Sequence, residues 1–195
     1  MHEKIAFSTL LWYNKKKLKL QQGENEMGIY LNPENVDFQE VLNSKIYIDK
    51  SELIQYTNSV LRTTQKYICV SRPRRFGKSM AANMLTAYYS RGCDSRGLFQ
   101  GLKIATHPDF EKYLNQYNVI HLNMRDYLTE SENMKELIQF VEDDLLDELQ
   151  QEFSDLRMPR RKTLVKVLEQ AFAQYKIPFV FIIDEINRGE ASKIL

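Results

Sequence analysis

The sequence has few cysteines, no excess of either charge and no long apolar run. Its two cysteines, Cys69 and Cys93, can form at most one disulfide and belong to no Cys/His cluster with zinc-ligand spacing, which favours a reducing, cytoplasmic setting. Lys and Arg total 27 and Asp and Glu total 26, so the net charge of +1 provides no global attraction to nucleic acid or acidic membranes. The longest apolar run, 179–183, is far shorter than the roughly 18 to 20 residues of a membrane span, and we expect no transmembrane helix.

The overall composition is that of a folded protein. With 43% hydrophobic and 27% charged residues among 195, the chain can bury a core, and its length suits one domain or part of a larger one. Residues 1–27 differ from the rest, because an apolar patch is followed by the basic run 15–19 and then by polar residues. We expect 1–27 to be a disordered N-terminal extension and 28–195 to be the folded part.

Helical patterns alternate with short, strand-forming apolar runs from residue 49 onward. Helical spacing of apolar residues predicts helices at 49–61, from Met80 to a stop at Gly92, at 133–152 and at 162–175. Uninterrupted apolar runs predict buried strands at 67–70, 119–122 and 179–183. This alternation predicts an α/β fold with a parallel sheet.

Two sets of polar residues in these elements have simple structural interpretations. The predicted helix 133–152 carries acidic residues around its apolar stripe, and we interpret them as a solvated face: Glu142, Asp143, Asp144, Asp147 and Glu148. His121 lies within a predicted strand, where a core histidine is more common than a metal ligand.

The loop after the predicted strand 67–70 resembles a phosphate-binding loop. Residues 72–79 match the Walker A pattern G-x-x-x-x-G-K-[ST], except that Arg72 replaces the first glycine. In this pattern Gly77 lets the backbone approach a phosphate, Lys78 reaches the β- and γ-phosphates, and the Ser79 hydroxyl can bind magnesium. A Gly-Lys-Ser tripeptide alone is weakly specific, but a strand-to-helix junction is the context that the motif requires.

A second motif follows about a hundred residues later. The predicted strand 179–183 ends in Asp184 and Glu185, as in a Walker B motif. There Asp184 can hold magnesium through water, while Glu185 orients or deprotonates the attacking water. An ordinary strand ending at a polar loop is the alternative for the acidic pair alone. The two motifs in this order favour nucleotide binding, with Lys78 and Glu185 as the catalytic candidates.

The arginines of the loop, Arg72, Arg74 and Arg75, have three interpretations. They can stabilise charge on a transferred phosphoryl group, bind nucleic acid, or lie in solvent. The alternative function is therefore a basic loop that binds nucleic acid without nucleotide hydrolysis.

Four segments together resemble the predicted AAA-type ATPases of bacteria and archaea, which often carry a nuclease-like domain at their C-terminus. These segments are 27–33, 47–51, 71–79 and 178–185, and in that family Arg-Pro-Arg-Arg-Phe-Gly-Lys-Ser is the usual loop. The resemblance implies a three-layer α/β/α P-loop domain that takes ATP and Mg²⁺, with Ser79 and Asp184 at the metal. It also implies a nucleotide site built from consecutive residues: Arg74, Arg75, Phe76, Gly77, Lys78, Ser79 and Met80.

The end of the sequence departs from that family. Residues 186–190 look more like the GTPase subunit of modification-dependent restriction systems, which leaves the choice of ATP or GTP open. The family's sensor strand, arginine finger and nuclease-like domain would all follow residue 195. We therefore expect 28–195 to be the N-terminal part of the ATPase domain, weakly active or inactive alone. A nucleic-acid partner would depend on the missing nuclease-like domain, and the oligomeric state is open.

Overall fold

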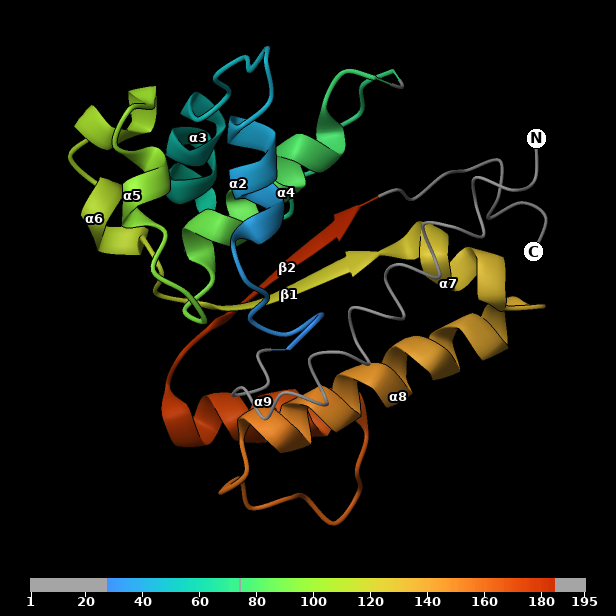
Figure 1. Cartoon of the computed structure of the whole chain (residues 1–195). Helices are drawn as coiled ribbons and strands as arrows, with labels where there is room; N and C mark the ends of the chain where they lie inside the picture. Colours follow the sequence, from blue (N-terminus) through green and yellow to red (C-terminus); the bar gives the residue numbers. More distant parts are fainter. Residues whose placement is uncertain (1–27, 74, 185–195) are drawn as a thin grey trace, which may run out of the picture.

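Two parallel strands lie at the centre of the protein (Figure 1). The computed structural model describes residues 28–73 and 75–184, and in it β1 (Asn118–Asn123) pairs with β2 (Phe179–Asp184) from Asn118↔Phe179 to Asn123↔Asp184. Parallel neighbours need a long crossover connection, and three helices lie between the two strands in the chain. The predicted α/β class with a parallel sheet is confirmed, and so are the strands at 119–122 and 179–183.

Helices cover both faces of this sheet (Figure 1). One layer contains α2 (Val36–Leu42), α3 (Glu52–Val60), α4 (Lys78–Tyr89), α5 (Arg96–Phe99), the 3-10 helix η1 (Lys103–Thr106) and α6 (Phe110–Tyr113). The other contains α7 (Met124–Glu130), α8 (Met134–Glu152) and α9 (Leu164–Tyr175). The predicted helices at 49–61, 133–152 and 162–175 correspond to α3, α8 and α9. No helix in the described parts of the chain is long and apolar enough to cross a membrane.

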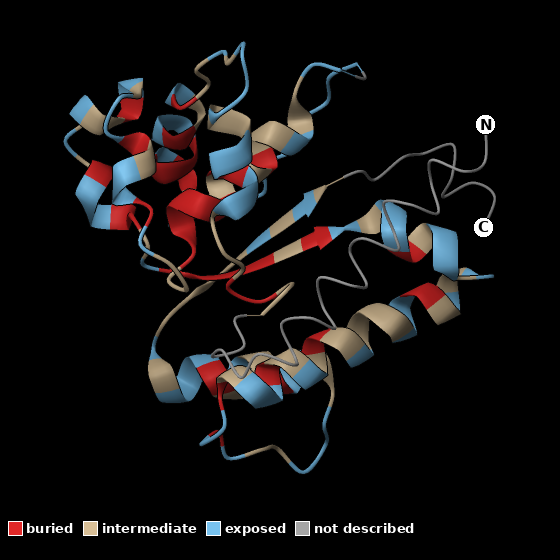
Figure 2. Ribbon diagram, in the orientation of Figure 1, coloured by how far each residue is buried: buried red, intermediate tan, exposed pale blue. Residues whose placement is uncertain are grey.

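Alternating strand residues build two separate cores. Val119 of β1 packs with buried aromatic side chains of the α2–α6 layer, whereas Ile120 and Leu122 pack with α8 and α9. Figure 2 shows the difference between the strands: β1 is mostly buried, while β2 is half-buried or exposed. Phe181 and Ile183 of β2 are 48% and 49% exposed. Within the described residues, β2 therefore has apolar surface that the α8–α9 layer does not cover.

The predicted strand at 67–70 is wrong in this structure. Residues 66–70 form neither helix nor strand, and the side chains of Tyr67 and Val70 are 85% and 50% exposed. A strand needs a neighbour for its backbone N–H and C=O groups. The sheet of the described residues holds β1 and β2 alone, so an apolar sequence is not sufficient to make this segment a strand.

The end predicted for the helix after the phosphate-loop pattern is also wrong. Helix α4 ends at Tyr89, with Ser90 as its C-cap, rather than at Gly92. Gly92 has a different role, because a Cβ atom there would lie 2.4 Å from the carbonyl oxygen of Asn32. The glycine allows the chain after α4 to approach the segment that precedes α2.

The acidic face of α8 is not simply solvated, contrary to the sequence-based interpretation. The Glu148 carboxylate accepts hydrogen bonds from the backbone N–H groups of Ile29, Tyr30 and Leu31, at 2.8, 2.9 and 2.7 Å. Asp144 accepts one from the Tyr127 hydroxyl at 2.9 Å. A solvated face would make no such contacts. Glu148 thus attaches residues 29–31 to α8, and Asp144 attaches α7.

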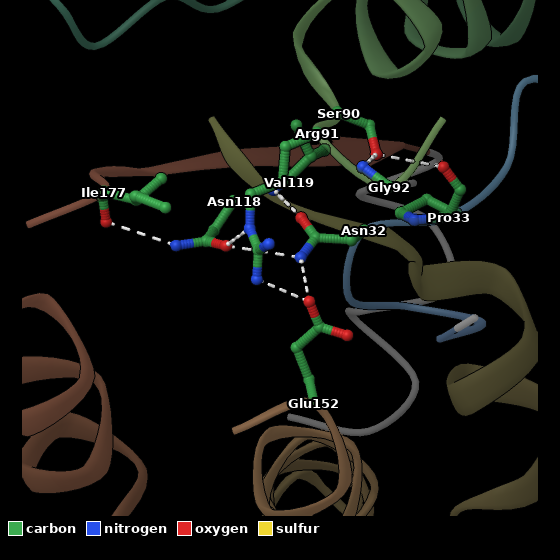
Figure 3. Close-up of polar contacts among 9 residues, drawn as sticks. All are labelled: Asn32, Pro33, Ser90, Arg91, Gly92, Asn118, Val119, Glu152 and Ile177. Atoms are coloured by element: carbon green, nitrogen blue, oxygen red, sulfur yellow. Dashed lines mark hydrogen bonds and ion pairs between the residues drawn. The ribbon is translucent and has the colours of Figure 1, made fainter. Parts of the chain in front are cut away.

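A polar network extends this attachment to the start of β1 (Figure 3). Glu152 forms an ion pair with Arg91 at 2.5 Å and accepts a hydrogen bond from the Asn32 amide at 3.1 Å. Asn32 and Arg91 both donate to the side-chain oxygen of Asn118, at 3.2 and 2.5 Å. Residues 30–32 also bond to the backbone of β1, through Asn32 N to Val119 O and His121 N to Tyr30 O. The segment thus covers the edge of β1 that does not face β2.

Candidate functional site

The predicted phosphate-binding loop leads into the start of α4. Gly77 is the N-cap, in the left-handed region with φ 74° and ψ 39°, and Lys78 is the first helical residue. Among the described residues, no side chain caps this end of the helix. The first-turn N–H groups of a helix have no acceptor within the helix itself, so those of Lys78, Ser79 and Met80 can bind an anion.

The Lys78 side chain turns back over the loop that precedes the helix. Its ammonium donates hydrogen bonds to the carbonyl oxygens of Arg72 and Pro73, at 2.8 and 3.3 Å. The positive charge is therefore held between the first residues of the motif and the N-terminus of α4. This is the position from which a lysine can reach a phosphate bound by the loop.

A second lysine lies at the same loop, and sequence reasoning missed it. The Lys50 ammonium donates to the carbonyl oxygen of Phe76 at 2.5 Å. It also lies 2.7 Å from where a Cβ atom at Gly77 would be. Lys50 belongs to the segment 47–51, which takes part in the family resemblance, but nothing in the sequence spacing relates it to a loop 26 residues later.

The segment that carries Lys50 is fixed by its neighbour Asp49. The Asp49 carboxylate accepts hydrogen bonds from the backbone N–H groups of Ser51 and Lys103, at 2.8 and 2.9 Å. Burial acts to raise the pKa of Asp49, but the hydrogen bonds from Lys103 and Ser51 outweigh it and hold the pKa below its ordinary value. The Ser51 hydroxyl in turn accepts from Ile104 N at 3.2 Å. Lys50 is therefore presented from the well-anchored start of α3.

The other predicted residues of the loop are mostly exposed. Arg72, Arg75 and Ser79 are exposed, Phe76 is 61% exposed, and Met80 is partly buried. Arg75 has a positive φ of 68°, so the loop contains two left-handed residues within three positions. Arg74 lies outside the described residues. The exposed side chains form an accessible rim around the N-terminus of α4.

Asp184 is the last residue of β2 and lies on the α4 face of the sheet. Val180 and Ile182 of the same strand pack against the core of the α2–α6 layer, and strand alternation places Asp184 on their side. Helix α4 contacts β2 directly, so both sequence motifs lie on one side of the sheet. Glu185 lies outside the described residues. Among those described, no three or more His, Cys, Asp or Glu side chains cluster as a metal site.

His121 is partly buried on the same face of the sheet, one strand away from Asp184. Burial lowers the pKa of His121 below its ordinary value, although the nearby charges of Asp184 and Asp37 act in the opposite direction. Burial therefore favours the neutral form of the imidazole.

The chain was compared with known families, curated proteins and solved structures. No curated protein and no solved structure matches it significantly. The model of a family described as a predicted AAA-ATPase matches residues 36–189, which is well over half of the chain and includes the loop, α4 and both strands. The chain therefore belongs to the predicted AAA-ATPase family.

Proposed function

We propose that this chain is the ATP-binding module of a P-loop ATPase, which binds Mg-ATP and hydrolyses it as part of a longer protein. The observation that carries the proposal is the junction of Gly77 and Lys78. A left-handed glycine ends the loop, uncapped amides begin α4, and the lysine ammonium lies over the loop carbonyls. Membership of the predicted AAA-ATPase family supports the same function.

The residues present fit a nucleotide and a magnesium ion. Gly77 allows close approach of the backbone, while the first-turn amides and Lys78 bind the β- and γ-phosphates. The remaining residues that we propose to bind the nucleotide are those predicted from the sequence, Arg74, Arg75, Phe76 and Met80. Ser79 and Asp184 offer the hard oxygen ligands that magnesium prefers, and the bound ion would neutralise charge on the phosphates. Glu185 would orient or deprotonate the attacking water.

The proposal includes a P-loop fold of three layers that is complete only with further chain. Apolar side chains at 67–70 are exposed, as are Phe181 and Ile183 on β2. We propose that downstream segments of the full protein provide strands that cover these residues. The segment 67–70 then becomes the strand that leads into the phosphate loop. Hydrolysis needs these segments too, so residues 1–195 alone should turn over ATP negligibly.

Calorimetric titration with ATP, with and without Mg²⁺, tests the proposal. The wild-type chain should bind, and Lys78→Ala should weaken binding about 10- to 100-fold, since a hydrogen bond to a charged group contributes about 1.5–3 kcal/mol. Arg75→Ala should weaken it less. Lys45→Ala, which removes an exposed lysine outside the site, is the matched control and should bind like wild type.

Equal affinity of the wild type and Lys78→Ala for ATP would overturn the proposal. The alternative, a loop that binds nucleic acid, makes a different prediction: no nucleotide binding, and a salt-dependent affinity for DNA or RNA that falls when Arg72, Arg74 and Arg75 are neutralised.

A further inference from the structure

We infer that Lys50 is a positioning residue of the nucleotide site, which fixes the orientation of the Phe76–Gly77 peptide so that the loop is ready to receive phosphate. The inference rests on the proposed function and adds a residue that neither sequence motif contains. It begins from one contact, the 2.5 Å hydrogen bond from the Lys50 ammonium to the carbonyl oxygen of Phe76.

This contact determines where the Gly77 N–H points. A trans peptide is planar, and its C=O and N–H groups point in opposite directions. Because Lys50 holds the Phe76 carbonyl, the Gly77 N–H is directed away from Lys50. Gly77 has no Cβ and adopts φ 74°, so its flanking peptide would otherwise rotate easily between orientations. The ammonium therefore restrains the peptide immediately before α4.

The glycine at position 77 and the lysine at position 50 depend on each other. A side chain at position 77 would be strained at this φ, and its Cβ would also lie 2.7 Å from the Lys50 ammonium. Gly77 is thus required twice, for its backbone conformation and for the approach of Lys50. The lysine stem packs beside the start of α4, where Lys50, Met80, Ala81 and Met84 line one small cavity.

Lys50 belongs to a segment that is anchored outside the loop. The carboxylate of its neighbour Asp49 accepts hydrogen bonds from the backbone N–H groups of Ser51 and of Lys103, the first residue of η1. Lys78 by contrast belongs to the motif itself and binds the carbonyls at the beginning of the loop. The two ammonium groups thus hold opposite ends of the loop, and Lys50 does so from a different part of the fold.

Titration of four proteins with ATP, ADP and inorganic tripolyphosphate tests this role. Lys50→Met keeps the aliphatic stem and removes the donor. It should lower the affinity for all three ligands about tenfold, the loss expected for one hydrogen bond to a charged group. Lys50→Arg keeps a charged donor and should restore affinity to within about threefold of wild type. Lys103→Met removes a nearby positive charge that pairs with Glu52 and not with the loop, and it should bind like wild type.

A merely structural role would give a different pattern. Melting temperatures are measured for each protein, and the inference requires that Lys50→Arg recover affinity even if it melts no higher than Lys50→Met. The Gly77 amide signal in ¹⁵N–¹H spectra should move in Lys50→Met and not in Lys103→Met. If Lys50→Met does not fold, Lys50→Gln replaces it.

The outcomes separate this inference from the proposed function. If wild type binds ATP, Lys78→Ala binds it about 10- to 100-fold more weakly, and Lys50→Met binds like wild type, the role of Lys50 is wrong and the proposed function stands. If wild type itself binds neither ATP nor tripolyphosphate, the proposed function is wrong and the role of Lys50 with it.

Discussion

Replacing Glu148 with Ala should destabilise the protein far more than an ordinary change on a helix surface. The carboxylate accepts three backbone hydrogen bonds, from Ile29, Tyr30 and Leu31. Hydrogen bonds to charged groups contribute about 1.5–3 kcal/mol each, but these are only partly buried, and water can replace some of them. We therefore expect a total loss of about 2–4 kcal/mol. For a chain of this size that corresponds to a melting temperature lower by roughly 5–15 °C.

Thermal melting measures this loss for the whole protein, and amide hydrogen exchange measures it at residues 29–31. The amides of residues 29–31 should exchange faster in Glu148→Ala, because their acceptor is removed. Glu148→Gln, which keeps one oxygen, should have an intermediate effect, and the exposed neighbour Asp147→Ala serves as the control with a small effect. If Glu148→Ala melts within 1–2 °C of the control and its 29–31 amides keep their exchange rates, the attachment of this segment to α8 is unimportant.

Two further predictions concern pH and the unpaired apolar segment. Burial holds the pKa of His121 below its ordinary value in the folded protein, so the free energy of unfolding should be highest above the ordinary pKa and decline as the pH falls through the pKa of the folded state. His121→Asn should reduce this decline, as measured by denaturant unfolding between pH 7 and 5. An unchanged dependence of the unfolding free energy on pH would contradict this prediction. The amides of residues 67–70 should exchange with solvent without protection, which hydrogen-exchange mass spectrometry would measure. The chain should also aggregate readily through its exposed apolar residues, which light scattering would measure. Slow exchange at 67–70 would contradict the first prediction.

The sequence predicted the long helices and the sheet direction because these follow from local patterns. Helix α8 has a regular apolar stripe, and its N-cap Asn133 accepts a hydrogen bond from the N–H of Glu136, so both its type and its start are encoded locally. Helices α5 and α6 have four residues each, too few for a periodic pattern, and were missed. The segment 67–70 shows the opposite failure, since its composition indicates burial while strand formation requires a partner.

The candidate site was predictable only within its motifs. Gly77 and Lys78 lie at a junction of loop and helix, as the pattern predicts, although the described residues do not form the strand expected before the loop. Lys50 was missed because its contact with Phe76 arises from tertiary packing between distant segments. For the same reason the sequence could not distinguish Glu148 from exposed acidic residues of the same helix such as Asp147. Only the tertiary structure brings the backbone N–H groups of residues 29–31 to the Glu148 carboxylate.

The most direct test of nucleotide binding at this loop is residue-resolved NMR of the isotope-labelled chain during titration with Mg-ATP. Saturable shifts should appear first in the backbone amides of Gly77, Lys78, Ser79 and Met80, which begin α4. Lys78→Ala should need about 10- to 100-fold more ATP to produce the same shifts. Shifts confined to another surface, or no change in these four amides at millimolar Mg-ATP, would contradict the assignment of this loop as the nucleotide site.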